Sequence, residues 1–134
     1  MRAALGDAPS SSAAGSVKPT VERVEVADAR VVRLTGEHDL ATAAEVRAAL
    51  EAAAETGEPV VCDLSRAEFV DSAILAALVS ADLRLRRTAR RLIVVLPAAA
   101  APTVRTVFDV SGLSAVLVIA ETVAAATPPS TPSG

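Results

Sequence analysis

Residues 60–75 read VVCDLSRAEFVDSAIL, and this stretch decides the fold. Its opening run is apolar and largely β-branched, which predicts a buried strand over residues 60–64, with Asp63 and Ser65 supplying turn chemistry. From Ser72 onward apolar residues recur at helical spacing, so a helix is expected as far as about Thr88. Ser72 therefore stands at or beside a helix N-terminus, where free N–H groups favour negative charge.

The residues before this stretch predict a hairpin followed by a helix. Residues 21–27 and 30–34 are two β-rich segments with a short break between them, which favours an antiparallel pair. Residues 35–39 interrupt the pattern with a glycine. The sequence Thr-Ala-Ala-Glu at residues 42–45 is a capping box, and it predicts a helix that ends at Gly57.

The residues after it continue the alternation of helix and strand. A strand is expected over residues 91–96, a shorter helix from Pro102 to Gly112, and a last strand around residues 115–119. Such alternation predicts an α/β domain with a mixed sheet of about five strands and about four helices. The initial hairpin is antiparallel, and the other strands are mostly parallel.

Composition narrows the class of protein. The chain has 134 residues, of which 51% are hydrophobic, with two Phe and no Trp or Tyr, so one domain with an aliphatic core is expected. The net charge of -3 and the scarcity of aromatic residues argue against a nucleic-acid partner. Residues 1–18 and 127–134 are rich in small and polar residues and are predicted to be disordered tails around a folded domain at 19–126.

The remaining composition indicates a cytoplasmic protein. Cys62 is the only cysteine, so it forms no internal disulfide, and its strand makes it a small buried hydrophobe. No apolar run approaches the roughly 18 residues of a spanning helix, so no membrane contact is expected. There is no metal-ligand spacing and no nucleotide-binding fingerprint, so neither metal nor cofactor is implied.

The residues around Ser72 leave two interpretations open. The pair Asp71-Ser72 is explained most simply as a helix cap. The alternative is that these residues have a regulatory or catalytic role. His38, Asp39 and Ser72 also contain the residue types of a hydrolase triad. No Gly-x-Ser-x-Gly elbow surrounds the serine, however, so a solvated histidine in a polar loop is favoured.

Three segments in order resemble one known family. Residues 63–75, DLSRAEFVDSAIL, are similar to the signature of the STAS domain, typified by bacterial anti-sigma factor antagonists. Residues 32–39, VRLTGEHD, resemble the early loop of that family, and residues 104–113, VRTVFDVSGL, resemble its late Phe-x-x-Ser-Gly-Leu segment. The resemblance covers nearly all of residues 19–126 and implies a STAS fold.

By this resemblance, Ser72 occupies the position of the serine that an anti-sigma factor with serine kinase activity phosphorylates and that a serine phosphatase restores. The unmodified protein would bind the anti-sigma factor and release its sigma factor, which makes it a partner-switching regulator of transcription and not an enzyme. The alternative is a STAS regulatory or scaffold subunit of another partner system that uses the same surface without phosphorylation.

The expected partner-binding residues flank the serine on the loop and on the first turns of the helix. They are Asp39, Asp71, Ser72, Ala73, Ile74, Leu75 and Val79. In one respect the chain departs from the family, because Ile74 stands where many relatives have glycine.

Two features of the same helix also have two interpretations. Arginines cluster at its C-terminal end, where they either complement the helix dipole in solvent or contact an acidic partner. These arginines are Arg84, Arg86, Arg87, Arg90 and Arg91. The apolar stripe of the helix is wide, so it either packs between the sheet and a neighbouring helix or leaves an outer part for docking.

Overall fold

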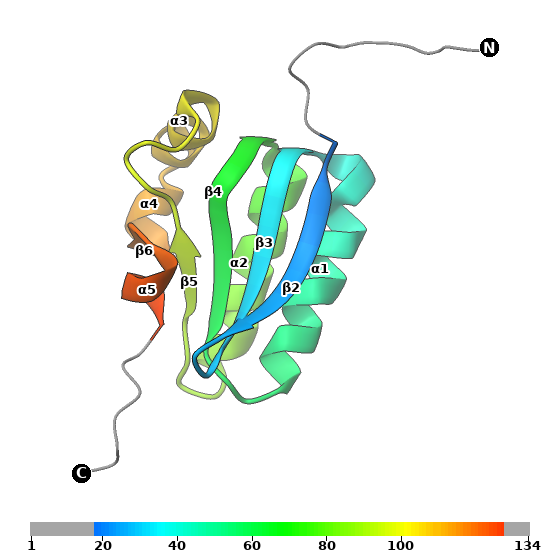
Figure 1. Ribbon diagram of the computed structural model, residues 1–134, viewed down its shortest axis with the longest axis vertical. Helices are drawn as coiled ribbons and strands as arrows, with labels where there is room; N and C mark the ends of the chain where they lie inside the picture. The colour runs from blue at the N-terminus through cyan, green and yellow to red at the C-terminus, as the bar shows by residue number, and fades with distance from the viewer. Residues whose placement is uncertain (1–17, 128–134) are drawn as a thin grey trace, which may run out of the picture.

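The computed structural model describes residues 18–127, and these residues form one mixed sheet with helices on its faces (Figure 1). The strands are β2 (Thr20–Val26), β3 (Ala29–His38), β4 (Val60–Val70), β5 (Leu92–Val95) and β6 (Val118–Ala120), in that order across the sheet. The helices are α1 (Leu40–Glu55), α2 (Ser72–Arg86), α3 (Pro102–Ser111), α4 (Leu113–Val116) and α5 (Val123–Ala126). The β2–β3 pair is antiparallel and every other neighbouring pair is parallel, which confirms the predicted fold class.

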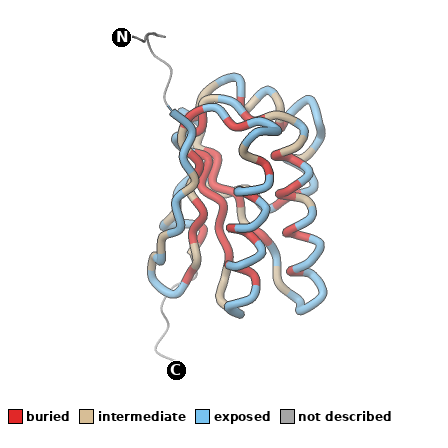
Figure 2. The backbone as a smooth tube through the Cα atoms, turned by 90° about the vertical axis from the view of Figure 1, so that its right-hand side faces the viewer, coloured by how far each residue is buried: buried red, intermediate tan, exposed pale blue. Residues whose placement is uncertain are grey.

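The main core lies between the sheet and helices α1 and α2, which stand behind the strands in Figure 1. Figure 2 shows the buried residues on the strands and on the inner faces of these helices. The helix α3 closes one end of this core with Val104 and Phe108, both fully buried. Aliphatic side chains make up nearly all of the rest, as the composition predicts.

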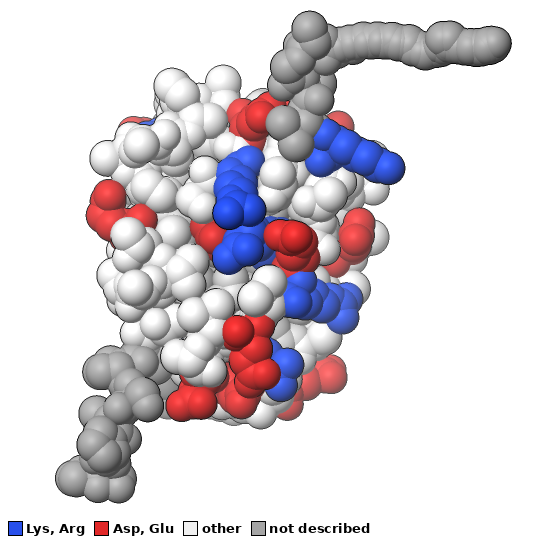
Figure 3. All heavy atoms as spheres, in the orientation of Figure 1, with Lys and Arg blue, Asp and Glu red and all other residues white. Residues whose placement is uncertain are grey.

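The opposite face of the sheet is covered less completely. The short helix α5 packs over β4, β5 and β6 there, above a small cluster that includes Val31, Val61 and Val95. Beyond this cluster the open face of the sheet carries charged side chains, among them the ion pair in which Arg33 Nε lies 3.1 Å from Asp63 Oδ2. Charged side chains therefore gather over β2, β3 and β4 in Figure 3, while the surface over α3, α4 and β6 is largely uncharged.

The two central strands are longer than predicted. Residues 35–38 continue β3, and residues 65–70 continue β4. The two strands stay paired over this length because their register shifts twice, and Gly36, whose φ is 86°, lies at the second shift. The expected turn at Asp63 and Ser65 is wrong. The Asp63 carboxylate instead accepts a hydrogen bond from Ser65 N at 2.9 Å and pairs with Arg33, so both polar groups are satisfied within the sheet.

Three element boundaries also differ from the prediction. The helix α1 begins at Leu40 with Asp39 as its N-cap, so the capping box at residues 42–45 is wrong. The helix α2 ends at Arg86, two residues earlier than expected. Gly112, with φ of 79°, ends α3 as predicted, but residues 113–116 then form the helical turn α4, so the last strand starts at Val118.

The predicted tails, residues 1–18 and 127–134, lie almost entirely outside the described residues 18–127. Their disorder stays a prediction. Among the helices of the described part, none has the length and apolar character needed to cross a membrane.

Candidate functional site

The helices α1 and α2 begin side by side at one edge of the sheet (Figure 1). Because β3 and β4 are parallel neighbours, His38 and Val70 lie opposite each other at the ends of these strands. A hydrogen bond of 3.2 Å from Asp71 N to His38 O joins the two backbone segments just before the helices start. We call residues 38–42 and 70–73 together the cap edge.

An aspartate caps each helix at the cap edge. The Asp39 carboxylate accepts a hydrogen bond from Ala41 N at 2.9 Å. The Asp71 carboxylate accepts hydrogen bonds from Ala73 N at 3.0 Å and from Ile74 N at 3.2 Å. Asp71 alone therefore fills the capping role at the start of α2.

Ser72 is the first residue of α2, and it is exposed. Within residues 18–127 its hydroxyl makes no hydrogen bond with another protein group. The backbone around it is held by Asp71, so the hydroxyl is not needed for the fold and is open to a partner or to modification.

The other residues expected at the partner surface differ in exposure. Asp39 is exposed, while Asp71, Ala73 and Val79 are half-buried. The side chains of Ile74 and Leu75 lie in the main core, with exposed fractions of 0% and 8%. Ile74 thus adds volume to the core and not to the surface.

His38 is fully buried, so the expectation of a solvated histidine is wrong. Its Nδ1 lies 2.9 Å from Thr42 Oγ1, and its Nε2 lies 3.0 Å from Thr35 O. The imidazole therefore ties the end of β3 to the first turn of α1, and neither ring nitrogen is directed to Ser72. This arrangement gives Ser72 no general base, which removes the basis of the triad interpretation.

The sequence interpretation missed two exposed apolar residues, one within the cap edge and one directly before it. Leu40 is 76% exposed at the start of α1, and Phe69 is 38% exposed near the end of β4. Leu40 also borders a shallow groove of about 350 Å³ along the outer face of α1. The signal available in the sequence was an apolar residue directly after Asp39, a position that faces solvent when the aspartate caps a helix.

The arginine cluster at the end of α2 mainly braces the fold. Asp82 is buried, and its carboxylate lies 3.0 Å from both Arg86 Nη2 and Arg91 Nε. Arg84 pairs with Glu55 on α1 at 3.3 Å. Arg90 donates hydrogen bonds to backbone carbonyls at and beyond the end of α1.

Within residues 18–127 no group of three His, Cys, Asp or Glu side chains is placed to hold a metal ion. The chemistry that the cap edge offers is therefore that of an exposed hydroxyl between two helix N-termini, with two carboxylates and two exposed apolar side chains around it.

Comparison with known proteins agrees with the fold. Residues 22–119 match the family model described as "Mlab, STAS domain". A crystal structure of an anti-sigma factor antagonist from Mycobacterium paratuberculosis is 26% identical, with a TM-score of 0.72 over 83% of this chain and 94% of that chain. No curated protein sequence gave a significant match.

Two structures of another antagonist are also similar. The anti-sigma factor antagonist SpoIIAA in its unphosphorylated form is 27% identical, with a TM-score of 0.60 over 77% of this chain and 88% of that chain. The Bacillus cell fate determinant SpoIIAA in its phosphorylated form is 28% identical, with a TM-score of 0.56 over 77% of this chain and 91% of that chain. The chain described here belongs to the STAS-domain family, and the solved structures that it resembles in this way are anti-sigma factor antagonists.

Proposed function

We propose that this protein is an anti-sigma factor antagonist whose binding is switched off by phosphorylation of Ser72. The unmodified protein binds an anti-sigma factor at the cap edge and so frees the sigma factor. A serine kinase activity of the anti-sigma factor transfers phosphate to the Ser72 hydroxyl, and a serine phosphatase removes it. The protein acts as a binding module and substrate, and it catalyses no reaction itself.

The observation that carries this proposal is the exposed Ser72 hydroxyl at the first position of α2, with the capping role already filled by Asp71. Similarity to SpoIIAA, for which structures in unphosphorylated and phosphorylated forms are known, supports phosphorylation as the proposed switch.

Electrostatics explain how phosphate at Ser72 would act. A phosphoserine adds about -1.5 to -2 charges and three acceptor oxygens. The N-terminus of α2 tolerates this charge within the protein, because its free N–H groups and dipole favour an anion. The surface that a partner meets changes more strongly, since the phosphate joins the carboxylates of Asp39 and Asp71 at one edge.

The partner surface extends from Ser72 over the exposed apolar residues beside it. Leu40 is the large exposed apolar residue at the start of α1, and Phe69 is the one that lies two residues before Asp71. The groove on the outer face of α1, bordered by Leu40, Ala44 and Ala48, continues this surface along the helix. Ile74 and Leu75 contribute by holding the first turn of α2 in place.

The test uses the full chain with ATP and each anti-sigma factor of its source organism. Mass spectrometry locates any phosphate, and calorimetry measures complex formation by the wild type, Ser72→Ala and Ser72→Asp. We expect modification at Ser72, binding by the wild type and Ser72→Ala, and binding by Ser72→Asp weakened about a hundredfold, which corresponds to about 3 kcal/mol.

Ser80→Ala is the matched control, because Ser80 is also exposed on α2 but lies two turns away from the cap edge. This variant should be phosphorylated and should bind like the wild type. Binding of all three Ser72 forms with equal affinity and without modification would favour a STAS regulatory subunit that works without phosphorylation. Absence of binding to every anti-sigma factor would contradict the antagonist role.

A further inference from the structure

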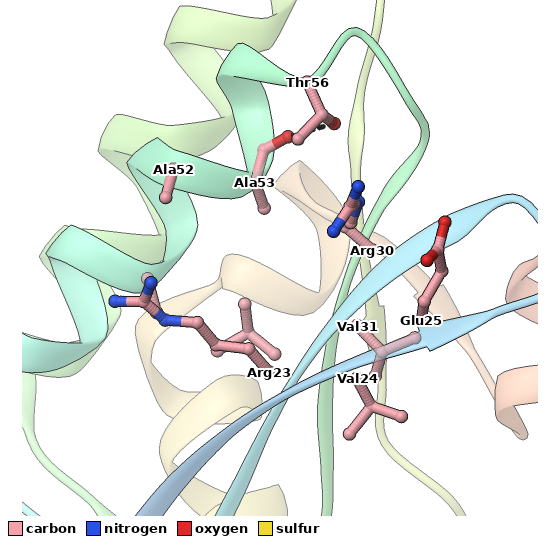
Figure 4. A pocket seen from close by; sticks show the side chains of 10 residues that line it. Arg23, Val24, Glu25, Arg30, Val31, Ala52, Ala53 and Thr56 are labelled. Carbon is pink, nitrogen blue, oxygen red and sulfur yellow. Dashed lines mark hydrogen bonds between the residues drawn. The ribbon is translucent and has the colours of Figure 1, made fainter.

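A second hollow lies far from Ser72, between the β2–β3 hairpin and the C-terminal half of α1. Its volume is about 350 Å³. Figure 4 shows Arg23 and Arg30 reaching from the two strands toward α1, where Ala52 and Ala53 face them. We call this hollow the hairpin groove.

Small side chains create the hairpin groove. The helix α1 presents Ala49, Ala52 and Ala53 toward the hairpin, and these short side chains leave space beside the edge strand β2. The helix α1 packs mainly against β3, whose Val32 is buried in the main core, and less closely against β2. The side of the groove formed by α1 is thus apolar. It consists of backbone and alanine methyl groups, which have no side-chain rotamers to change.

The charges around the hairpin groove balance in number but are unevenly placed. Glu25 lies opposite Arg30 in the strand register, whereas Arg23 lies opposite the apolar Val32. Arg30 is occupied, since its Nε lies 2.6 Å from Glu58 Oε1, and its hydrogen bond with Glu58 and the nearby charge of Glu25 raise the pKa of its guanidinium. Arg23 makes no ion pair with any residue of the described part of the chain. An unpaired guanidinium beside an apolar wall suits a ligand that has an anionic group and an apolar body.

We propose that the hairpin groove is a binding site for a small amphipathic anion, with Arg23 pairing with its carboxylate, sulfonate or phosphate group and the alanine wall of α1 covering its apolar part. The proposal does not depend on the function of Ser72, because the groove is lined by residues of α1 from Ala49 to Thr56 and the cap edge lies at the opposite end of that helix.

The probe is 8-anilinonaphthalene-1-sulfonate, whose fluorescence rises when its rings leave water, and its uncharged counterpart is N-phenyl-1-naphthylamine. We expect saturable binding of one sulfonate probe per folded chain, with amide shifts in two-dimensional NMR confined to the hairpin and the second half of α1. The uncharged probe should bind about tenfold more weakly, because it lacks the charge-assisted contact with Arg23.

Two variants separate the charge from the wall. Arg23→Gln should weaken the sulfonate probe about tenfold and leave the uncharged probe unchanged. Ala52→Leu should weaken both probes, because the larger side chain fills the groove while keeping helix propensity. The matched controls are Arg66→Gln, which removes another exposed arginine, and Ala76→Leu, which makes the same change at an exposed position of α2.

Circular dichroism of every variant establishes that it is folded, so that probe binding to loosened chains is excluded. Equal binding of the sulfonate probe by the wild type and both groove variants would overturn the proposal. So would amide shifts centred on the uncharged surface over α3 and β6, or the absence of saturable binding by the wild type.

Discussion

Two adjacent residues at the start of α2 have different tasks. Asp71 satisfies two N–H groups of the first turn, and Ser72, the next residue, is exposed, with no hydrogen-bond partner for its hydroxyl among residues 18–127. From sequence the two are equally plausible caps, since serine and aspartate are both preferred there. The direction of the side chains separates them, and this separation makes Ser72 available as a surface group.

The capping task is tested by removing the Asp71 carboxylate. We expect Asp71→Ala to lower the free energy of unfolding by about 1 kcal/mol, because two N–H groups at the start of α2 lose their acceptor. Asp71→Asn keeps an acceptor oxygen and should cost less. Urea denaturation followed by circular dichroism measures both, and Ser72→Ala should change stability by less than about 0.5 kcal/mol. A larger loss in Ser72→Ala than in Asp71→Ala would contradict this division of tasks.

At the scale of elements, Asp82 joins α2 to β5. It lies on the buried face of α2, and Leu92 N donates a hydrogen bond of 2.9 Å to its Oδ1 at the first residue of the strand. Arg86 comes from the same helix and Arg91 from the loop before the strand, so a helix, a loop and a strand meet at one carboxylate. This arrangement turns part of the arginine cluster into a structural connection.

The pH dependence of stability follows from the environment of Asp82. Burial by itself raises the pKa of Asp82. Hydrogen bonds from Arg91 and Leu92 N and the charges of Arg91 and Arg86 lower this pKa by more than burial raises it, so the pKa lies below its ordinary value. The ionised carboxylate therefore stabilises the fold above the unfolded-state pKa near 3.9, and this contribution is lost as the pH falls through the folded-state pKa.

We expect Asp82→Asn to lower the free energy of unfolding by about 2 kcal/mol at pH 7, because two guanidinium groups lose their counter-ion. The difference from the wild type should shrink as the pH is lowered below about 4. Urea titrations at several pH values measure it. Glu55→Gln is the control, since the Glu55–Arg84 pair is exposed and should matter little. A difference that stays constant down to pH 2 would rule out the ionic contribution.

At the scale of the whole molecule, β4 is the central strand, and both of its faces are covered over residues 60–64. Cys62 points from this strand into the main core and is fully buried, as its apolar surroundings predicted. Burial raises the pKa of the Cys62 thiol, so the reactive thiolate does not form in the folded protein at ordinary pH. A reagent can reach Cys62 only when the sheet separates from its helices.

Labelling of Cys62 should therefore report global unfolding. We expect an aromatic disulfide reagent to react with the folded chain roughly a thousandfold or more slowly than with the urea-unfolded chain, in parallel with the loss of circular dichroism. Ser65→Cys places a thiol at an exposed position of the same strand and should react at once in native buffer. Rapid, stoichiometric labelling of Cys62 in the folded wild type would show that the core opens locally.

The sequence alone determined the order of elements, the mixed sheet and the place of Ser72 at a helix start. These features follow from periodicity, from glycines such as Gly112 and from ordered motifs, all of which act between residues close in the chain. The same local information could not set the ends of β3 and β4, because their bulges depend on pairing between strands about 30 residues apart.

Burial at the site was decided only in three dimensions. Ile74 and Leu75 belong to the core. His38 is enclosed by Thr35 and Thr42, although Glu37 and Asp39 on either side of it are exposed. Helical spacing specifies which residues share a face, but the packing of α2 against both α1 and the sheet decides how wide the buried face is. The polar partners of Asp82 and the hairpin groove arise in the same way, from side chains that only the folded chain brings together.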